Sequence, residues 1–480
     1  MKLKLNEEIL DAIIVGGGIG GVAVGALLAH DGFKVKLFEK NKLIGGRCLT
    51  YDYKGFKVDL GVHLFGVGPK GYLGDVCKRI EMPNAIQWVI SNNPRPTMYY
   101  DGEFKIYSRK NMGQVVGASK EDFDLTMKFF ADILSMRKKQ IKELYYTGLT
   151  DFINKYSTNP ILHTFISMIA GQYFCTFPDE TSAGELIRCF RQVVTAKSSA
   201  YPIGACIAIP KAYKRGIEKY GGEVSLESPV KKIIVEENKA KGIELEDGSV
   251  FYSNIVISNA DIQNTVSNLV GDDKFPKEYS NRVKDLKYAN HCLALKIGLK
   301  QPITDQKLIM AASGLDYNRI KSMEKELLGG KVPEKAGGMI TIPTNYDPNL
   351  APEKGNQMIF FGTGCLGGQS KSYYEKWGEI CWETLLEIFP DAEKHLIWKK
   401  LDTPRLVESY AGEYGNIIGV AQTVDQIHER RPKHQTPIEG LYIVGAEAGG
   451  HGIGAELAAN SAMELYNILT KLKIKVQHSD

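Results

Sequence analysis

Residues 11–39 read DAIIVGGGIGGVAVGALLAHDGFKVKLFE, and this stretch decides how the rest of the chain is interpreted. The apolar run at 12–15 predicts a strand that is buried on both faces. A glycine-rich turn follows, then small residues typical of a close-packed helix at 22–30, then a second apolar strand at 34–38. The order strand, turn, helix, strand predicts a βαβ unit of a parallel sheet.

The glycines of this turn have G-x-G-x-x-G spacing, which is the pattern of a dinucleotide-binding loop. Gly16 permits a tight turn, Gly18 lets a pyrophosphate approach the backbone, and Gly21 allows the helix to pack closely on the strand. The helix N-terminus offers free N–H groups to the phosphates. Glu39 lies 18 residues after Gly21, close to the distance at which an acid meets a ribose hydroxyl, which favours FAD or NAD over NADP. The residues assigned to the nucleotide here are Gly16, Gly18, Gly20, Gly21, Glu39 and Lys40.

The composition indicates a globular protein of more than one domain. The chain has 480 residues, of which 43% are hydrophobic and 24% charged, so it can bury a large core. A net charge of +4 argues against a dedicated nucleic-acid partner. The eight cysteines form no C-x-x-C pair, so no metal site is expected and a reduced, cytoplasmic protein is predicted. There is no signal-peptide pattern and no apolar run long enough to span a membrane, so peripheral membrane contact is the most that is expected.

A second glycine pair and a histidine follow the acid. Gly45, Gly46 and Arg47 could bring backbone and a forked cation to a phosphate. The segment at 59–65 reads DLGVHLF. His63 in this segment is interpreted either as a residue that fixes the loop or as a proton donor or acceptor.

These motifs together resemble the flavoproteins of the amine oxidase and phytoene desaturase superfamily. The resemblance implies an α/β fold in which a Rossmann-like FAD-binding domain of the glutathione-reductase type 2 class is combined with a discontinuous α+β substrate domain. It implies FAD as the cofactor and places Gly45, Gly46 and Arg47 at its pyrophosphate and Gly61, Val62 and His63 beside the flavin. The matching bend at 228–230 places the Val230 backbone at the adenine.

The last part of the chain carries the family's second signature. Residues 436–445 read TPIEGLYIVG, and GAEAGGHGIGAE follows at 445–456. The resemblance implies that Gly445 and Glu447 meet the pyrophosphate or ribityl chain and that Gly452, Ile453 and Gly454 open a helix at the flavin ring. A helix N-terminus there would stabilise negative charge on the reduced ring. His451 is left with two interpretations, protonation or loop fixing.

The domain division follows from where these motifs lie. The FAD-binding domain is expected at 1–70, 206–268 and 426–480, and the substrate domain at 71–205 and 269–425. Within the substrate domain, 119–146 reads as one long helix and 160–177 as an apolar helix. The apolar helix is interpreted as a core helix, with the wall of an apolar substrate tunnel or a membrane-dipping face as the alternative. Arg188 and Arg191 are expected to be solvated charges on a helix. The alternative is that they bind an acidic head group of the substrate.

The function implied is an FAD-dependent desaturase, saturase or isomerase acting on C–C or C=C bonds of an apolar, isoprenoid or carotenoid-like substrate. No second nucleotide motif has strand context, so an external electron donor or acceptor is expected. A flavin amine oxidase is one alternative, disfavoured because Ala294 aligns where that group often has a lysine, with Lys296 the nearest lysine. A lipid carrier on the same fold, like the Rab GDP-dissociation inhibitors, is the other. His63 and His451 are the candidate catalytic residues, and the oligomeric state is left open.

Overall fold

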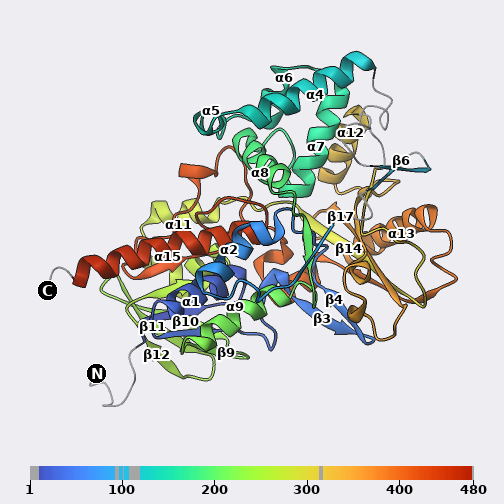
Figure 1. Cartoon of the computed structure of the whole chain (residues 1–480). Helices are drawn as coiled ribbons and strands as arrows, with labels where there is room; N and C mark the ends of the chain where they lie inside the picture. The colour runs from blue at the N-terminus through green and yellow to red at the C-terminus, as the bar shows by residue number, and fades with distance from the viewer. Residues whose placement is uncertain (1–9, 92–96, 101, 107–118, 313–316, 478–480) are drawn as a thin grey trace.

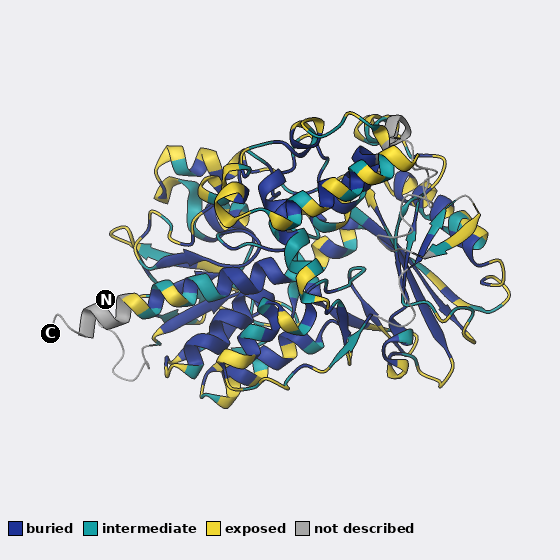
Figure 2. Ribbon diagram, turned by 45° about the horizontal axis from the view of Figure 1, so that its top comes forward, coloured by how far each residue is buried: buried dark blue, intermediate teal, exposed yellow. Residues whose placement is uncertain are grey.

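The computed structural model describes residues 10–91, 97–100, 102–106, 119–312 and 317–477. The described residues form two large sheets, three smaller ones and several groups of helices, and residues far apart in the sequence build both large sheets (Figure 1). Buried residues follow the strands of both sheets and the inner faces of the helices (Figure 2).

The first sheet is parallel and has five strands in the order β19-β13-β1-β2-β9. Its strands are β19 (Leu441–Ile443), β13 (Val256–Ser258), β1 (Ala12–Val15), β2 (Val35–Phe38) and β9 (Glu223–Ser225). The predicted βαβ unit is therefore confirmed, with β1 at the centre and α1 (Ile19–His30) as the crossover helix.

The two faces of β1 bury different partners because side chains alternate along a strand. Ala12 and Ile14 face the core that includes α1 and α9 (Ala208–Lys219), and α15 (Ala455–Gln477) packs on α1. Ile13 and Val15 face an antiparallel sheet of β10 (Val230–Glu236), β11 (Lys239–Leu245) and β12 (Val250–Tyr252). This double burial explains the uninterrupted apolar run in the sequence.

The second sheet has seven strands in the order β18-β14-β17-β16-β15-β6-β7. They are β18 (Leu396–Asp402), β14 (His291–Leu299), β17 (Gln357–Cys365), β16 (Gly338–Thr341), β15 (Leu308–Ala311), β6 (Thr97–Tyr100) and β7 (Glu103–Ile106). The helix α13 (Lys371–Ile388) covers one face with buried Trp377 and Leu385. Every strand of each sheet falls inside the segments expected for its domain, while the domain boundaries themselves stay a prediction.

A third group consists of helices with a core of their own, rich in phenylalanine. They are α4 (Lys120–Ser135), α5 (Lys138–Glu143), α6 (Leu149–Asn154), α7 (Pro160–Phe174) and α8 (Ala183–Ala196), and we call them the helical cap. They lie together at the top of Figure 1.

The single helix expected over 119–146 is wrong, because the chain leaves helical geometry at Met136 (ψ 135°). Arg137 is the N-cap residue of α5, and its N–H donates to the Gln140 side chain at 2.9 Å. The expected start at Ser119 is confirmed, since its hydroxyl accepts the Asp122 N–H at 3.1 Å.

The remaining elements connect these units. They are β3 (Thr50–Tyr53) paired with β4 (Phe56–Asp59), β5 (Trp88–Ile90) paired with β8 (Ala200–Pro202), and the helices α2 (Tyr72–Arg79), α10 (Ile262–Asn264), α11 (Lys277–Lys284), α12 (Tyr317–Leu328) and α14 (Pro404–Ala411). Within the described residues, none of the helices combines the length and the apolar character needed to cross a bilayer. The cytoplasmic location stays a prediction.

Candidate functional site: a dinucleotide loop opening into an apolar chamber

One cavity of about 1550 Å³ connects the glycine loop after β1 with the second sheet and the helical cap. At one end it is lined by the residues of the glycine loop and the G-G-R loop. At the other end it is lined by α7, α8, β14 and β16. Most of the residues assigned to the site from the sequence therefore line one continuous cavity.

The glycine loop leaves no room for side chains where the nucleotide is expected. Gly16 has a φ of +98°, which disfavours any other residue. A Cβ on Gly18 would lie 2.7 Å from the Asn259 Oδ1 atom, and one on Gly20 would lie 2.6 Å from the Gly445 Cα atom. Gly16, Gly18 and Gly20 line the cavity, whereas Gly21 does not. A Cβ on Gly21 would lie 2.2 Å from the Gly16 carbonyl oxygen, so this glycine serves helix–strand packing.

Glu39 is buried at the edge of the cavity and held in place from both sides. One carboxylate oxygen accepts the Gly17 N–H at 2.7 Å, and the other accepts the Asn41 N–H at 2.9 Å and side-chain amide at 2.8 Å. Lys40 and Val230 line the cavity beside it. Glu39, the glycine loop and Val230 therefore line the same cavity, while their contacts with a nucleotide stay a prediction.

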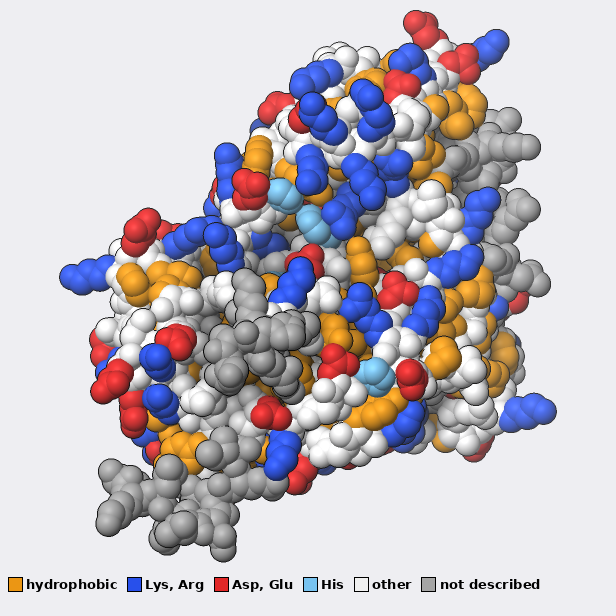
Figure 3. Space-filling model, turned by 60° about the vertical axis from the view of Figure 1, so that its left-hand side comes forward, with side chains coloured by type: hydrophobic (Ala, Val, Ile, Leu, Met, Phe, Trp, Pro, Cys, Tyr) orange, Lys and Arg blue, Asp and Glu red, His pale blue; other side chains and the backbone are white. Residues whose placement is uncertain are grey.

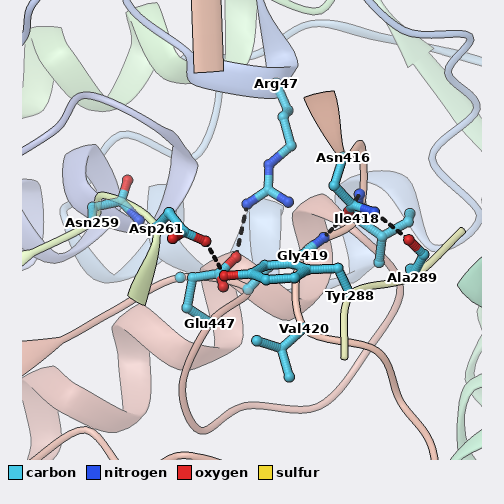
Figure 4. A network of polar contacts seen from close by, with 12 residues as sticks. Arg47, Asn259, Asp261, Tyr288, Ala289, Asn416, Ile418, Gly419, Val420 and Glu447 are labelled. Atoms are coloured by element: carbon cyan, nitrogen blue, oxygen red, sulfur yellow. Dashed lines mark hydrogen bonds and ion pairs between the residues drawn. The ribbon is translucent and has the colours of Figure 1, made fainter. Parts of the chain in front are cut away.

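The G-G-R loop from the N-terminal part of the chain meets the C-terminal signature at an ion pair. Arg47 Nη2 lies 3.2 Å from Glu447 Oε1, and Figure 4 shows the guanidinium pointing toward that carboxylate. Glu447 is buried, and burial raises its pKa to about 7. Arg47, Gly45 and Gly46 line the cavity, whereas Glu447 and Gly445 lie behind the lining residues.

A loop at 416–419 closes over this pair. Asn416 Oδ1 accepts the Gly419 N–H at 2.6 Å, and a Cβ on Gly419 would lie 2.5 Å from Glu447 Oε1 (Figure 4). Two buried oxygens in this region, Glu447 Oε2 and Asn259 Oδ1, make no hydrogen bond with the described residues. Unpaired buried acceptors are costly. Of these two residues, Asn259 lines the cavity, so its Oδ1 atom is suited to accept a hydrogen bond from a ribose or ribityl hydroxyl.

The segment after β4 presents Gly61, Val62 and His63 to the cavity. The His63 ring stacks on Phe65 with centroids 5.8 Å apart, and its Nδ1 atom is buried without a partner among the described residues. Burial lowers the pKa of His63, so the ring is neutral near pH 7 and has an accepting or donating nitrogen available. His63 therefore lines the cavity, and its place beside the flavin stays a prediction.

Lys296 binds the backbone of the residues just before Gly61. It is fully buried, and its Nζ donates to the carbonyl oxygens of Asp59 and Leu60, at 2.9 Å for Leu60, and lies 2.5 Å from Asp402 Oδ2. Burial lowers its pKa despite the adjacent Asp402 carboxylate. Ala294 on the same strand lines the cavity and Lys296 does not. The cavity wall thus has alanine at the position that was aligned with the amine-oxidase lysine.

His451 lies outside the residues that line the cavity. Its Nδ1 atom is 2.8 Å from Glu185 Oε2 on α8, and its ring stacks on Tyr145. Burial would raise the pKa of Glu185, but the hydrogen bond with His451 holds it below its usual range. Glu185 Oε1 also accepts the Gly452 N–H at 3.1 Å. This placement favours loop fixing, and the protonation role of His451 stays a prediction.

Ile453 and Gly454 line the cavity just before α15 begins. Glu456, in the first turn of that helix, is a site residue that the sequence analysis did not identify. Glu456 is buried, lines the cavity, and accepts the Leu73 N–H at 3.2 Å through Oε2. Its Oε1 atom has no partner among the described residues. Burial raises the pKa of Glu456 to about 8. A buried acid that is protonated near neutral pH is a candidate proton donor.

The chamber beyond the glycine loop is mainly apolar. Its lining includes Phe130, Met168, Ile169, Tyr173, Phe190, Val193, Leu308, Met310 and Met339. The helix expected at 160–177 packs in the cap core and also forms a wall of the chamber. The membrane-dipping face that was the other alternative for it stays a prediction. Arg188 and Arg191 do not line the cavity and are engaged within the cap by Tyr145 and by the Met136 carbonyl.

Among the described residues, one group has metal-ligand spacing. The donor atoms of Cys48, His63 and Cys206 lie within 4.8 Å of one another. Both sulfurs are already engaged, because Cys206 Sγ donates to Asp59 at 2.9 Å and Cys48 Sγ donates to the Cys206 carbonyl at 3.6 Å. The absence of a metal stays a prediction.

The fold and the site define an α/β protein with a Rossmann-like nucleotide-binding unit that opens into an apolar chamber. Residues 14–80 match a family model described as an NAD(P)-binding Rossmann-like domain. The chain is 27% identical to a chloroplastic prolycopene isomerase of Daucus carota, over 91% of this chain and 76% of that protein. It is 23% identical to a zeta-carotene-forming phytoene desaturase of Myxococcus xanthus, over 90% and 89% of the two chains.

Solved structures agree with the fold. An oxidoreductase from Methanosarcina mazei aligns with a TM-score of 0.73 and 21% identity, over 95% of this chain and all of that one. A putrescine oxidase aligns with a TM-score of 0.71 and 12% identity, over 97% and 100% of the two chains. The expected fold class and the resemblance to phytoene desaturase-like and carotenoid isomerase-like oxidoreductases are confirmed.

Proposed function

We propose that this protein is an FAD-dependent oxidoreductase that acts on C–C or C=C bonds of an apolar, isoprenoid substrate. The observation that carries the proposal is the single cavity that runs from the dinucleotide loop into a chamber walled by phenylalanine, methionine and aliphatic side chains. Nucleotide and apolar substrate would share one continuous cavity, and transfer between them requires that they lie in contact. Relatives named as a prolycopene isomerase and a phytoene desaturase support a polyene-like substrate.

The residues present fit FAD. Gly16, Gly18 and Gly20 leave backbone free for the pyrophosphate, and Glu39 stands where a ribose hydroxyl is expected. Arg47 would neutralise phosphate charge, and the unpaired Oδ1 atom of Asn259, which lines the cavity, would accept a hydroxyl hydrogen bond. When bound, FAD supplies hydride transfer chemistry.

The chain itself contributes shape, exclusion of water and proton-holding groups. The apolar walls exclude water and orient an extended hydrocarbon. His63 holds an unpaired Nδ1 atom in the cavity, and Glu456 holds a proton near neutral pH at a buried carboxyl whose Oε1 atom is unpaired among the described residues. Either group could exchange a proton with a reacting carbon through direct contact or one water.

The flavin amine oxidase alternative is less well supported. Ala294 occupies the cavity wall, and Lys296 is committed to backbone carbonyls and Asp402. A lipid carrier on the same fold needs no reducible flavin, so flavin reduction by substrate separates it from an enzyme.

The experiment is anaerobic incubation of the flavin-loaded protein with phytoene, prolycopene and putrescine in turn, following flavin absorbance. We expect phytoene to bleach the flavin, or prolycopene to isomerise on the reduced protein, while putrescine has no effect. Bleaching by putrescine alone would favour the amine oxidase. Tight binding of the polyene without redox change or isomerisation would favour the carrier.

The external electron partner predicted from the sequence remains part of this proposal. A membrane contact is a second part of it, and a basic surface of the helical cap supports that contact. Arg137, Lys138, Lys139 and Lys142 are exposed on and beside α5. Figure 3 shows Lys and Arg side chains gathered at the top of the molecule, over the helical cap. Such a basic surface suits anionic lipid headgroups, and it lies on the same cap whose helices wall the chamber.

A further inference from the structure

Two cysteines face each other inside the cavity. Cys175 Sγ and Cys292 Sγ lie 3.6 Å apart, and both residues line the cavity and are half-buried. Cys175 directly follows α7, and Cys292 is the second residue of β14. The Asn290 N–H donates to the Cys175 carbonyl at 2.7 Å, which fixes the two backbone segments against each other.

We propose that Cys175 and Cys292 form a thiol–disulfide redox pair that exchanges with low-molecular-weight disulfides and dithiols entering the cavity. The site is distinct from the nucleotide loop and adds a second two-electron centre to the protein. The proposal does not depend on FAD binding, because the exchange needs only the two thiols and a small disulfide.

The other cysteines lack this combination of proximity and access. Cys77, Cys189, Cys206 and Cys381 are buried and do not line the cavity. Cys48 lines the cavity, but its side chain is only 4% exposed and its sulfur donates to the Cys206 carbonyl at 3.6 Å. Cys365 pairs in register with His291 on the neighbouring strand, but its side chain is fully buried. A small reagent in the cavity therefore reaches Cys175 and Cys292, and these are the thiols whose sulfurs already touch.

The exchange balances in two steps. The Cys175 sulfur attacks one sulfur of a small disulfide, which forms a mixed disulfide and releases one thiol. Cys292 then attacks Cys175 Sγ, which closes the Cys175–Cys292 disulfide and releases the second thiol. The two electrons and two protons of the protein thiols end on the two released small thiols.

The hydrogen bond with Cys175 and burial raise the pKa of the Cys292 thiol well above its ordinary value. The exchange can begin at Cys175, and the reverse order, in which Cys292 attacks first and Cys175 closes the disulfide, balances in the same way.

The closed form would join two walls of the chamber. The link would connect the end of α7 to the start of β14 across 117 residues of chain. Both elements carry chamber residues, Met168 and Ile169 on one and Leu293 and Ala294 on the other. Oxidation would therefore restrict how far these walls can separate.

The test treats the full-length purified protein with oxidised glutathione, quenches with acid, and alkylates the denatured chain with N-ethylmaleimide. Intact mass and peptide mapping then count adducts and locate crosslinks. We expect two fewer adducts than the eight of the reduced chain, a Cys175–Cys292 crosslinked peptide, and full recovery of adducts after dithiothreitol. Cys381→Ser serves as the matched control and should still lose two adducts on oxidation.

The variants Cys175→Ser and Cys292→Ser should form no crosslink on oxidation. Peptide mapping of the unaltered chain decides the question even where a variant fails to fold. Retention of all eight adducts, a crosslink between other cysteines such as Cys175 and Cys365, or glutathione retained on Cys175 without closure would each overturn the proposal.

Discussion

Glu456→Gln tests the buried acid at the chamber, and its effect should depend on pH. In the folded protein burial raises the Glu456 pKa from 4.5 to about 8. A raised carboxyl pKa means that the folded state holds the proton more tightly than the unfolded state does. The contribution of this group to stability therefore falls as pH rises from about 4.5 through about 8, and levels off above. Glutamine has nearly the same shape, can still accept the Leu73 N–H, and has no proton to lose.

The size of the effect follows from the same values. When the pH is raised from about 5.5 to about 8.5, the free energy of unfolding of the unaltered protein should fall by about 3 kcal/mol relative to that of Glu456→Gln. Denaturant midpoints at both pH values, measured on proteins of matched flavin content, check this. Glu464→Gln is the control in the same helix: burial opposes ionisation there too, but the hydrogen bond with His434 leaves the Glu464 pKa lowered. An equal stability difference at both pH values for Glu456→Gln would refute the reasoning.

Three further changes have defined outcomes. Gly21→Ala places a methyl group 2.2 Å from the Gly16 carbonyl oxygen. We expect the free energy of unfolding to fall by about 3 kcal/mol or more, measured by thermal unfolding. We also expect the variant to lose its flavin, measured by flavin absorbance. Lys296→Met leaves the buried Asp402 without one of its partners, so the free energy of unfolding should fall by about 3 kcal/mol. Reduction of the flavin by the polyene should persist. If a folded Lys296→Met variant no longer reduced its flavin, Lys296 would take part directly in the reaction. Charge reversal of the exposed lysines of α5 should remove salt-sensitive sedimentation with anionic vesicles and leave binding to the polyene unchanged; unaltered sedimentation would exclude α5 as the contact.

The nucleotide unit was predictable because its information is local. The turn glycines, the acid and both strands of the βαβ unit lie within residues 11–39, and each has a steric or electrostatic requirement that the sequence displays directly. The helix break at Met136 was not predictable in this way. Residues there suit a helix, and the side chain of Gln140 caps a new one.

The rest of the site depends on contacts that sequence spacing does not encode. Glu456 meets Leu73 across 383 residues, and His451 meets Glu185 across 266. Only the fold shows that the first is buried at the chamber and that the second is turned toward the cap. The signal that could have singled out Glu456 was an acid in the first turn of a helix that otherwise begins with small, buried residues.

The central claim is that the N-terminal glycine loop and the C-terminal signature enclose one FAD. Reconstitution of the purified chain with FAD, followed by gel filtration and absorbance at about 450 nm, tests it most directly. The account predicts one tightly held flavin per chain in the unaltered protein and its loss in Gly18→Val, whose side chain would meet Asn259. A folded, colourless protein that takes up no FAD would contradict the account.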